Sequence, residues 1–326
     1  MTMARRRVVL MTALSFVIAL LGTVASAAAQ QAPAAPLVRE NATVKLTDHV
    51  WVIPDFNVGG VPNVGIVVGS RATMVVDTGM GPRNGETIVR EMNKVSKNTE
   101  VYVATSHYHP EHTLGTSAFK GAKVVMPRIQ QQDMQELGKA IQDMFASRSA
   151  LNAELLNGVT YPAVDILFDR EQRIDLGGVN VRLFTRGPTP LHTRGDTMIV
   201  VEEDRVLFTG DVVMGRRFLA ASATPPASIK LWISTLDELA ALRPVKVVPS
   251  HGDLGDATLI ARDREYLQAV QKRVGELKRQ GKTIDEAVQA VAAEIAPKYP
   301  EWGNPAGSAA TARAAFAEAA GGRPAY

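Results

Sequence analysis

The segment TSHYHPEHTLG, residues 105–115, holds three of the six histidines in the chain together with a glutamate. It follows an apolar run, VYVATS, which predicts a strand that ends where the histidines begin. Residues two apart in a strand lie on the same side, so His107 and His109 can face one metal ion together. Imidazole nitrogens suit zinc, a borderline-soft cation, and a carboxylate offsets its charge. With Glu111 and His112 beside that pair, the segment has the residue types that a site for two metal ions needs.

Pro110 fixes the local geometry of this motif. The residue before a proline is restricted to extended backbone, which we expect for His109, and proline itself suits the first position of a helix. A helix that begins at Pro110 has Glu111 and His112 in its first turn. The sequence therefore predicts that a strand end and a helix start meet at the metal site.

Metal-ligand residue types recur after three later predicted strands. The segments GPTPLHTRGD, LFTGD and VVPSHGD contain His192, Asp211 and His251, respectively. Five of the six histidines thus lie at or just beyond strand ends, and we interpret the sixth, His49, as a structural residue. The chain has no cysteine, so a metal site must use histidine and carboxylate, and no disulfide can stabilise the fold.

Predicted strands and helices follow one another in both halves of the chain. Apolar runs separated by turn residues predict strands in TVKLT, VWVIP, GIVVGS, ATMVVDTG and AKVVMP, and later in QRIDLGG, VNVRLFTRG, DTMIVVEED and RVLFTGD. Helical spacing predicts helices over 128–156, 229–242 and 256–279, and Thr283 with Glu286 forms a capping box at the start of another. Two halves that each run strands and then helices indicate layered sheets with helices outside.

Apolar residues recur at helical spacing within residues 128–156. They are Met134, Leu137, Ile141, Met144 and Phe145. Such a stripe indicates core packing. The alternative is a helix that covers a pocket.

The first 29 residues have the composition of a secretory signal peptide. Three arginines precede an apolar run that extends to about residue 25, and the small residues after it offer cleavage points following residue 27 or 29. A membrane anchor is the alternative, but the Ala-x-Ala endings favour cleavage. We therefore expect residues 30–42 to be a spacer and the mature protein to be periplasmic or secreted, without stable membrane association. Both the general secretory route and the twin-arginine route stay open.

The net charge gives no reason to expect a nucleic-acid partner. The full chain has 36 basic and 33 acidic residues, a formal net charge of +3, but three of the arginines lie in the predicted signal peptide. The rest of the chain therefore has equal numbers of acidic and basic residues. Its 46% hydrophobic and 21% charged residues are ordinary for a globular protein. We expect a small-molecule substrate and no nucleic acid.

The segment HYHPEH resembles the HxHxDH motif of the metallo-β-lactamase superfamily, and PLHTRGD, FTGD and VPSHG are similar to its later metal-ligand motifs, in the same order. The resemblance runs from about Thr43 to Arg273. It implies an α/β fold, the αβ/βα four-layer sandwich, with two mixed β-sheets flanked by helices and the metals at one edge between the sheets. We accordingly expect a catalytic domain over residues 43–300, followed by an alanine-rich C-terminal helix and tail at 301–326.

The same resemblance implies a ligand for each of two metal ions. One ion would be bound by His107, His109 and His192, the other by Glu111, His112 and His251, and Asp211 would bridge the two. The segment VVDTG, with Asp77, resembles a family loop that supports the site from beneath. The implied cofactor is zinc, two ions per chain, with a single ion or iron as the alternatives.

Glu111 departs from the family pattern, which has aspartate at this position. The extra methylene moves the carboxylate outward by about 1.5 Å, whereas metal–ligand distances tolerate an error of only about 0.2 Å. Either the backbone accommodates the longer side chain or the second metal is bound differently. This substitution therefore leaves open how many metal ions the site binds.

The resemblance implies a hydrolase. By this resemblance, the bound metals would supply a hydroxide nucleophile for a carbonyl group and would stabilise the negative charge that develops on its oxygen. We expect an exported zinc-dependent hydrolase of a small ester, lactone or lactam. Glu111 and Asp211 are the expected catalytic carboxylates, and Glu111 would orient the hydroxide and pass its proton to the leaving group.

Two alternatives belong to other functional classes. An iron-dependent oxidoreductase is the first, since sulfur dioxygenases of the same fold use a similar histidine and aspartate set. Colour, iron content and oxygen consumption would identify it. The second is a non-catalytic exported protein with a structural metal site, which would have closed coordination, whereas catalysis needs an open position.

Overall fold

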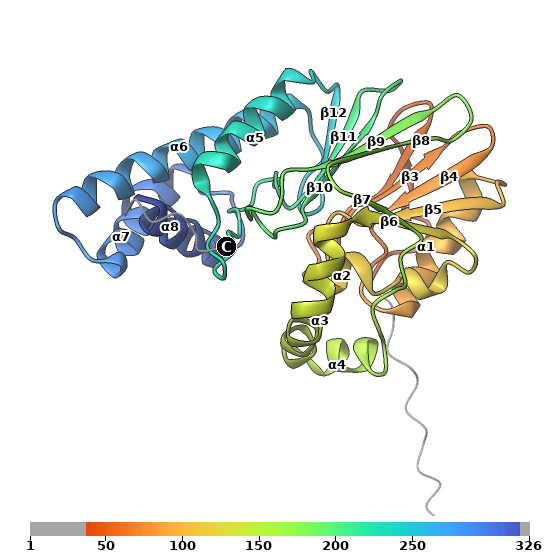
Figure 1. The fold of residues 1–326 in the computed structure, drawn as a ribbon, viewed down its shortest axis with the longest axis horizontal. Helices are drawn as coiled ribbons and strands as arrows, with labels where there is room; N and C mark the ends of the chain where they lie inside the picture. The colour runs from red at the N-terminus through yellow and green to blue at the C-terminus, as the bar shows by residue number, and fades with distance from the viewer. Residues whose placement is uncertain (1–36, 320–326) are drawn as a thin grey trace, which may run out of the picture. The chain divides into compact units, whose positions relative to one another are not determined.

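The structure, a computed structural model, describes residues 37–319 (Figure 1). Two β-sheets form the centre of this part of the chain. The first has seven strands in sequence order: β1 (Val44–Lys45), β2 (Val50–Ile53), β3 (Val64–Val68), β4 (Ala72–Val76), β5 (Glu100–Ala104), β6 (Lys123–Pro127) and β7 (Ile166–Phe168). The second has five strands in the order β12-β11-β10-β9-β8: β8 (Glu171–Asp175), β9 (Asn180–Thr185), β10 (Thr197–Val201), β11 (Val206–Gly210) and β12 (Lys246–Pro249).

Both sheets are mixed. In the first sheet, β1 to β4 pair antiparallel and β4 to β7 pair parallel. In the second sheet, β8 to β11 pair antiparallel and β12 pairs parallel with β11. Strands β9, β11 and β12 therefore run in one direction, so their carboxyl ends reach the same edge of the sheet. The carboxyl ends of β4 and β5 likewise share one edge of the first sheet.

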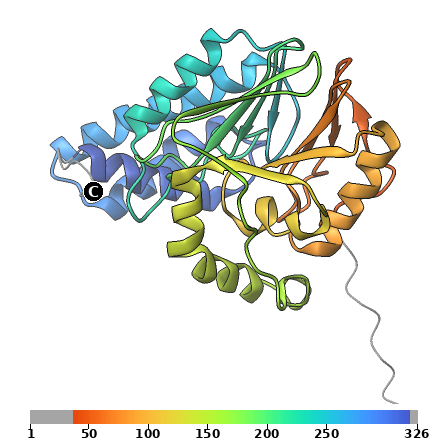
Figure 2. The same ribbon diagram turned by 45° about the vertical axis from the view of Figure 1, so that its right-hand side comes forward.

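Three apolar clusters define four layers. One cluster lies between the two sheets and combines Val52 and Met74 of the first with Phe208 and Val248 of the second. Another joins the outer face of the first sheet to α1 (Pro82–Val95) through residues such as Ile88. The third cluster covers the outer face of the second sheet with helices from the C-terminal part of the chain. Figures 1 and 2 show α1 on one side and the C-terminal helices on the other, and this arrangement confirms the expected four-layer sandwich.

The C-terminal helices share one core. They are α5 (Ile229–Ala241), α6 (Ala257–Arg279), α7 (Ile284–Ala290) and α8 (Pro305–Ala319). The predicted capping box is present, since Thr283 and Glu286 bind each other's backbone. Helix α8 contributes Ala312 and Ala315 to the cluster that α5 and α6 form with the second sheet. The alanine-rich segment is thus packed against the α6 side of the molecule.

The helix predicted over residues 128–156 is two helices, so that prediction was wrong in its extent. Helix α3 (Arg128–Ser147) ends before Ser149, whose side chain caps α4 (Ala150–Leu156) by accepting a hydrogen bond from Asn152 N at 3.0 Å. Serine is a preferred N-cap because its short side chain satisfies an otherwise unpaired backbone N–H. The residues of the apolar stripe, Met134 to Phe145, all lie in α3, so their spacing gave no sign of where that helix ends.

The predicted signal peptide and most of the predicted spacer lie outside the described residues. The described end of the spacer is held in place, because the backbone N–H groups of Leu37 and Val38 donate to the side chain of Asn84 at 2.7 and 2.8 Å. Among residues 37–319, no helix combines the length and the hydropathy that crossing a bilayer requires.

Candidate metal centre

The histidine motif lies between a strand and a short helix, as the sequence predicts. Strand β5 ends at Ala104, and α2 (Pro110–Thr113) begins six residues later with Pro110 at its first position. His109 has extended backbone, with φ −62° and ψ 151°, and serves as the N-cap of α2. Glu111 and His112 fall in the first helical turn. The backbone restrictions of Pro110 therefore place three of the predicted ligands within one turn of each other.

The second sheet supplies the remaining predicted ligands from its aligned strand ends. Asp211 directly follows β11, His251 follows β12, and His192 lies in the loop between β9 and β10. The loop of His192 is held by Asp196, whose carboxylate accepts hydrogen bonds from His192 N at 2.9 Å and from Thr193 Oγ1 at 2.6 Å. Each sheet thus contributes side chains from one edge.

All seven predicted ligands come together in overlapping groups. In each group every member offers a ligand atom within 4.8 Å of the others. The groups are His107, His109 and His192; Glu111, His112 and His251; and His107, His112 and Asp211. The first two are the sets that the sequence motifs imply for two metal ions. Whether each residue binds a metal stays a prediction, and the structure establishes that they are close enough to do so.

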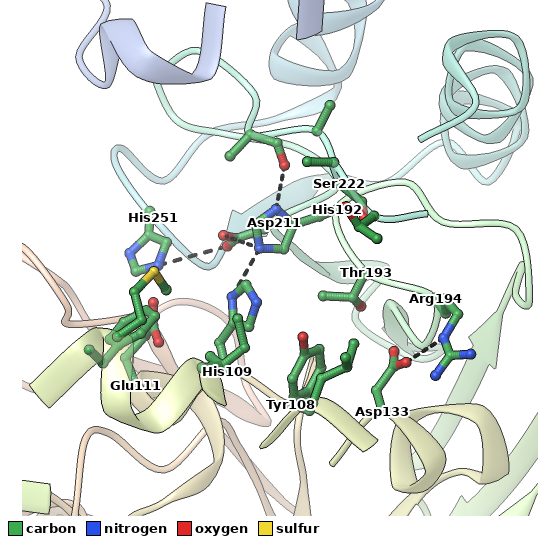
Figure 3. A pocket seen from close by; sticks show the side chains of 18 of the residues that line it. Tyr108, His109, Glu111, Asp133, His192, Thr193, Arg194, Asp211, Ser222 and His251 are labelled. Atoms are coloured by element: carbon green, nitrogen blue, oxygen red, sulfur yellow. Dashed lines mark hydrogen bonds and ion pairs between the residues drawn. The ribbon is translucent and has the colours of Figure 1, made fainter. Parts of the chain in front are cut away.

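Asp211 lies between the first two groups. Its Oδ2 is 3.3 Å from His192 Nε2, and its Oδ1 is 3.8 Å from His251 Nε2. Figure 3 shows the carboxylate of Asp211 between these two imidazoles, with His109 and Glu111 below all three in this view. A carboxylate whose two oxygens face different ligand groups has the position that a bridge between two cations requires.

Buried polar atoms without partners test whether a metal fits. Four such atoms lie in these groups: His107 Nε2, Glu111 Oε2, His112 Nε2 and Asp211 Oδ1. A buried polar atom without a hydrogen bond is unfavourable by about 1–3 kcal/mol. In addition, His192 Nε2 and His109 Nδ1 face each other at 3.2 Å. Lone pairs that converge in this way fit a shared cation, and the nitrogen and oxygen donors suit zinc.

The other ring nitrogen of three histidines is fixed by a hydrogen bond. His192 Nδ1 donates to the carbonyl of Ala220 at 2.6 Å, and His251 Nδ1 donates to that of Val61 at 2.9 Å. His112 Nδ1 lies 2.9 Å from Asp77 Oδ2. These contacts leave each Nε2 directed at the centre, the arrangement that holds metal-binding imidazoles in one tautomer.

Asp77 lies beneath the site, as its motif implies. It follows β4 with a positive φ of 64°, and its oxygens accept hydrogen bonds from Ser106 N at 2.7 Å, Ser106 Oγ at 2.9 Å and Ser250 Oγ at 3.0 Å. Because Ser106 precedes His107 and Ser250 precedes His251, one buried carboxylate ties together the loops from both sheets. Sequence reasoning missed the roles of Ser106, Ser250 and Asp196, although each is adjacent to a ligand motif.

Burial keeps two of the imidazoles neutral. Burial, reinforced by the neighbouring histidines, lowers the pKa of His107 and of His109. Burial also acts to lower the pKa of His112, but the charge and the hydrogen bond of Asp77, together with two further carboxylates, outweigh it and raise that pKa to about 9. Neutral rings have the lone pairs that metal ligands need. His112 can keep its Nδ1 proton toward Asp77 and still offer Nε2 to a cation.

The two carboxylates of the centre are shifted in opposite directions. Burial raises the pKa of Glu111. Burial also acts to raise the pKa of Asp211, but His251 and His192 outweigh it and lower that pKa to about 2. Asp211 is therefore a fixed negative charge, whereas Glu111 is the carboxyl that more readily holds a proton.

Glu111 reaches the second group despite its extra methylene. Its side chain is buried, and Oε1 lies 3.8 Å from His112 Nε2. The longer side chain of Glu111 therefore fits where the family motif has aspartate. The number of bound metal ions remains a prediction.

A cavity of about 520 Å³ gives access to the ligand groups. His109, Glu111, His192, Asp211 and His251 line it. The apolar stripe of α3 lines it too, through Leu137, Ile141, Met144 and Phe145. Of the two interpretations of that stripe, both apply, because Phe145 is also part of a buried cluster.

His49 lies apart from the ligand groups. Its Nδ1 is 2.8 Å from Asp204 Oδ1, and its backbone N–H donates to the same carboxylate. The interpretation of His49 as a structural residue agrees with this contact.

The sequence profile of the Metallo-beta-lactamase superfamily matches residues 57–251, which is more than half of the chain. A relative from Emericella nidulans, the lactamase-like protein aptB, is 24% identical over 216 residues. That match covers 65% of this chain and 57% of the relative, so the chain spans little more than half the length of the curated relative it matches.

Solved structures with the same fold include a metallo-beta-lactamase from Pontibacter korlensis and the sec-alkylsulfatase Pisa1 from Pseudomonas sp.. The first is 20% identical with a TM-score of 0.54, and the match covers 69% of this chain and 98% of that one. The second is 16% identical with a TM-score of 0.65, and the match covers 85% of this chain and 50% of that one. At these identities the likeness concerns the fold.

Proposed function

Since the chain belongs to the metallo-beta-lactamase superfamily, we propose that it is an exported zinc-dependent hydrolase of a small ester, lactone or lactam. The observation that carries this proposal is the position of the ligand groups at the wall of a cavity. Five of the seven predicted ligands line a space of about 520 Å³, a volume in the range of small-molecule sites. A structural metal site has closed coordination, whereas a hydrolase needs a position that substrate and water can reach.

Two groups of three ligands would hold the metal ions, His107, His109 and His192 for one and Glu111, His112 and His251 for the other, with Asp211 between them. When bound, zinc supplies a Lewis acid and lowers the pKa of water enough to provide a nucleophile at neutral pH. No serine or cysteine nucleophile is then required.

Glu111 is the residue of this chain that would move the proton. Burial raises its pKa, and Oε2 is buried without a hydrogen-bond partner at the cavity wall. A carboxyl in this position can take a proton from the attacking water and give it to the leaving group. Asp211, with its pKa lowered to about 2, keeps its charge throughout.

Tyr108 would help to orient the substrate. It lies between two predicted ligands in the sequence, and Figure 3 shows it between His109 and Asp133 at the cavity wall. Burial raises the pKa of its hydroxyl, so the group stays protonated and can donate a hydrogen bond. An acyl oxygen held at this wall would lie beside the ligand groups.

The proposal is tested by elemental analysis of the protein purified without chelators, together with hydrolysis assays on matched esters, lactones and lactams. We expect zinc, at two ions per chain, and turnover of at least one substrate class. His109→Ala and His192→Ala should each remove turnover and lower the zinc content. His49→Ala, which alters the histidine outside the centre, is the matched control and should change neither. Unchanged turnover in both ligand variants would contradict the proposal.

The same measurements test the alternative functions. Iron in place of zinc, a coloured protein and oxygen consumption would favour an oxidoreductase of this fold. Bound zinc with no turnover of any substrate class would favour a protein with a structural metal site. Export is tested by the N-terminal residue of the mature protein, which we expect to follow residue 27 or 29.

A further inference from the structure

Three arginines line the cavity at the metal centre, and they differ in their partners. They are Arg148, Arg194 and Arg217. The charge of Arg194 is offset, because its guanidinium lies 2.5 Å from both Asp133 and Glu136; Figure 3 shows the contact with Asp133. Within residues 37–319, neither Arg148 nor Arg217 has a carboxylate at ion-pair distance. The cavity therefore has two guanidinium groups without an ion-pair partner among the described residues.

Arg148 stacks on Phe145, an aromatic residue near a predicted metal ligand. Its guanidinium carbon lies 3.7 Å from the centre of the Phe145 ring, and that ring lies 6.0 Å from the ring of His109, a predicted ligand. Arginine stacks on an aromatic face and still presents the N–H groups of its edge. The stacked guanidinium can thus bind an anion close to His109.

Arg217 comes from a different wall of the cavity. It is half-buried in the segment after Asp211, and its backbone bridges to Gly303. Three residues further on, the carbonyl of Ala220 accepts the hydrogen bond that orients His192. The position of Arg217 is therefore tied to the metal centre through its own loop.

Apolar side chains line the same cavity as the two arginines. Leu137, Ile141 and Met144 of α3 line the cavity, and Met144 is 42% exposed to solvent. The segment 220–225 also lines the cavity, with four small apolar residues, Ala220, Ala221, Ala223 and Pro225, and two polar ones, Ser222 and Thr224. Exposed apolar walls of this kind bind hydrocarbon, since binding removes their surface from water.

From these features we infer that the site takes amphiphilic anions: molecules with an apolar body of about the size of a short alkyl chain and one negatively charged group. The body packs between α3 and the alanine-containing segment, and Arg148 and Arg217 bind the charged group. This inference rests on the proposed function, since it assigns a substrate class to the same site. Carboxylates and sulfates share the chemistry that two guanidinium groups recognise.

Binding of three ligands with the same alkyl body tests the inference. Octanoate, octyl sulfate and uncharged 1-octanol are titrated into zinc-loaded protein by calorimetry, for the wild type and for Arg148→Ala, Arg217→Ala and Arg216→Ala. Arg216 is the matched control, since it is paired with Asp253 and Glu301 and does not line the cavity. Zinc content is measured for every variant, so that a change in affinity can be assigned to the lost arginine and not to lost metal.

We expect Arg148→Ala and Arg217→Ala each to weaken binding of at least one anion by about tenfold, the effect of losing a hydrogen-bonded charge pair. Binding of 1-octanol should not change, and Arg216→Ala should behave as the wild type. Tighter binding of octyl sulfate would indicate sulfate esters, and tighter binding of octanoate would indicate carboxylate-bearing substrates. Equal affinity of the wild type and both cavity variants for both anions would overturn the inference.

The outcome is separable from that of the proposed function. Arginine-dependent anion binding without turnover would leave this inference standing and remove the hydrolase proposal. Turnover of neutral esters, with anion binding unaffected by either arginine, would do the reverse. Because Arg148 is exposed and Arg217 is half-buried without an ion pair, neither substitution should prevent folding, and thermal unfolding checks this directly.

Discussion

Asp77 Oδ2 lies 2.9 Å from His112 Nδ1, and both side chains are almost completely shielded from solvent. The two residues are 35 positions apart in the chain. The contact therefore couples the end of β4 to the first turn of α2, and it couples the charge of a buried carboxylate to a predicted metal ligand.

Replacing Asp77 with asparagine should weaken metal binding and destabilise the protein. Asparagine tolerates the positive φ of 64° at this position, so the backbone is preserved while the charge is lost. Loss of a partner that orients a metal ligand lowers metal affinity by about 10–100-fold, and loss of one member of a buried pair destabilises by about 3 kcal/mol. Zinc titration and denaturant unfolding measure the two effects. Asp48→Asn, at an exposed site, is the control, and equal effects of the two substitutions would count against this role of Asp77.

The length of the Glu111 side chain should determine occupancy of the second metal site. Glu111→Ala removes the carboxylate, and we expect one bound metal ion per chain in place of two. Glu111→Asp retracts it by about 1.5 Å, which exceeds the error of about 0.2 Å that metal–ligand distances tolerate. That variant should therefore bind the second ion at least tenfold more weakly. Metal analysis after dialysis against a range of free zinc concentrations measures this, with Glu86→Asp on α1 as the control. Retention of both ions by Glu111→Ala would show that the carboxylate is not a ligand.

Removal of metal should lower thermal stability. Chelation leaves four buried atoms of the ligand groups without partners, and a ligand present at 1,000 times its dissociation constant stabilises the folded state by about 4 kcal/mol. The midpoint of thermal unfolding should rise with zinc concentration and fall on addition of chelator. His109→Ala should reduce this dependence. A midpoint that is independent of zinc would mean that the centre does not bind it.

Asp263 should make the folded protein less stable as the pH rises. An aspartate whose pKa is lowered by folding has the opposite effect. Asp263 is buried on α6, accepts a hydrogen bond from Met214 N at 2.8 Å, and burial raises its pKa well above the usual value. Because the folded state holds the proton more tightly, this contribution to stability is complete below the unfolded pKa of about 3.9. It is lost as the pH rises through the pKa of the folded state. Asp263→Asn stays uncharged, so its stability should improve relative to the wild type between pH 4 and pH 8. If the curves of unfolding free energy against pH are parallel for the wild type and Asp263→Asn, this role of Asp263 is ruled out.

Trp232 should act in stability and not in substrate binding. Its side chain is completely buried between α5 and the second sheet, and Nε1 donates to the carbonyl of Val212 at 2.8 Å. Trp232→Ala should therefore reduce the unfolding free energy by about 4 kcal/mol, whereas Trp232→Phe should reduce it by about 1 kcal/mol through the lost hydrogen bond. Denaturant unfolding measures both, with Lys230→Ala as the exposed control on the same helix. Zinc content and affinity for substrate should be unchanged in the phenylalanine variant.

Local physical constraints made much of this protein predictable from its sequence. Alternating apolar residues identified most strands, and Pro110 fixed both the extended backbone of His109 and the start of α2. The order of the ligand motifs along the chain matched a known family, so the four-layer fold and the groups of predicted ligands followed from the sequence. The boundaries of these elements depend on neighbours within a few residues, where backbone geometry leaves few alternatives.

Tertiary structure alone decided how these local pieces act together. Side-chain periodicity indicates which face a residue occupies but not which distant residue it meets. The contact of Asp77 with His112 results from the pairing of β4 with β5, and the hydrogen bond of His192 to Ala220 joins two loops of the second sheet. The packing of one sheet on the other brings Asp211 to the ligand groups of the first sheet and Ser250 to Asp77. The same reason explains the cavity. Arg194 forms an ion pair with Asp133, 61 residues away, whereas neither Arg148 nor Arg217 has an ion-pair partner among residues 37–319. Only the folded chain distinguishes the paired arginine from the other two.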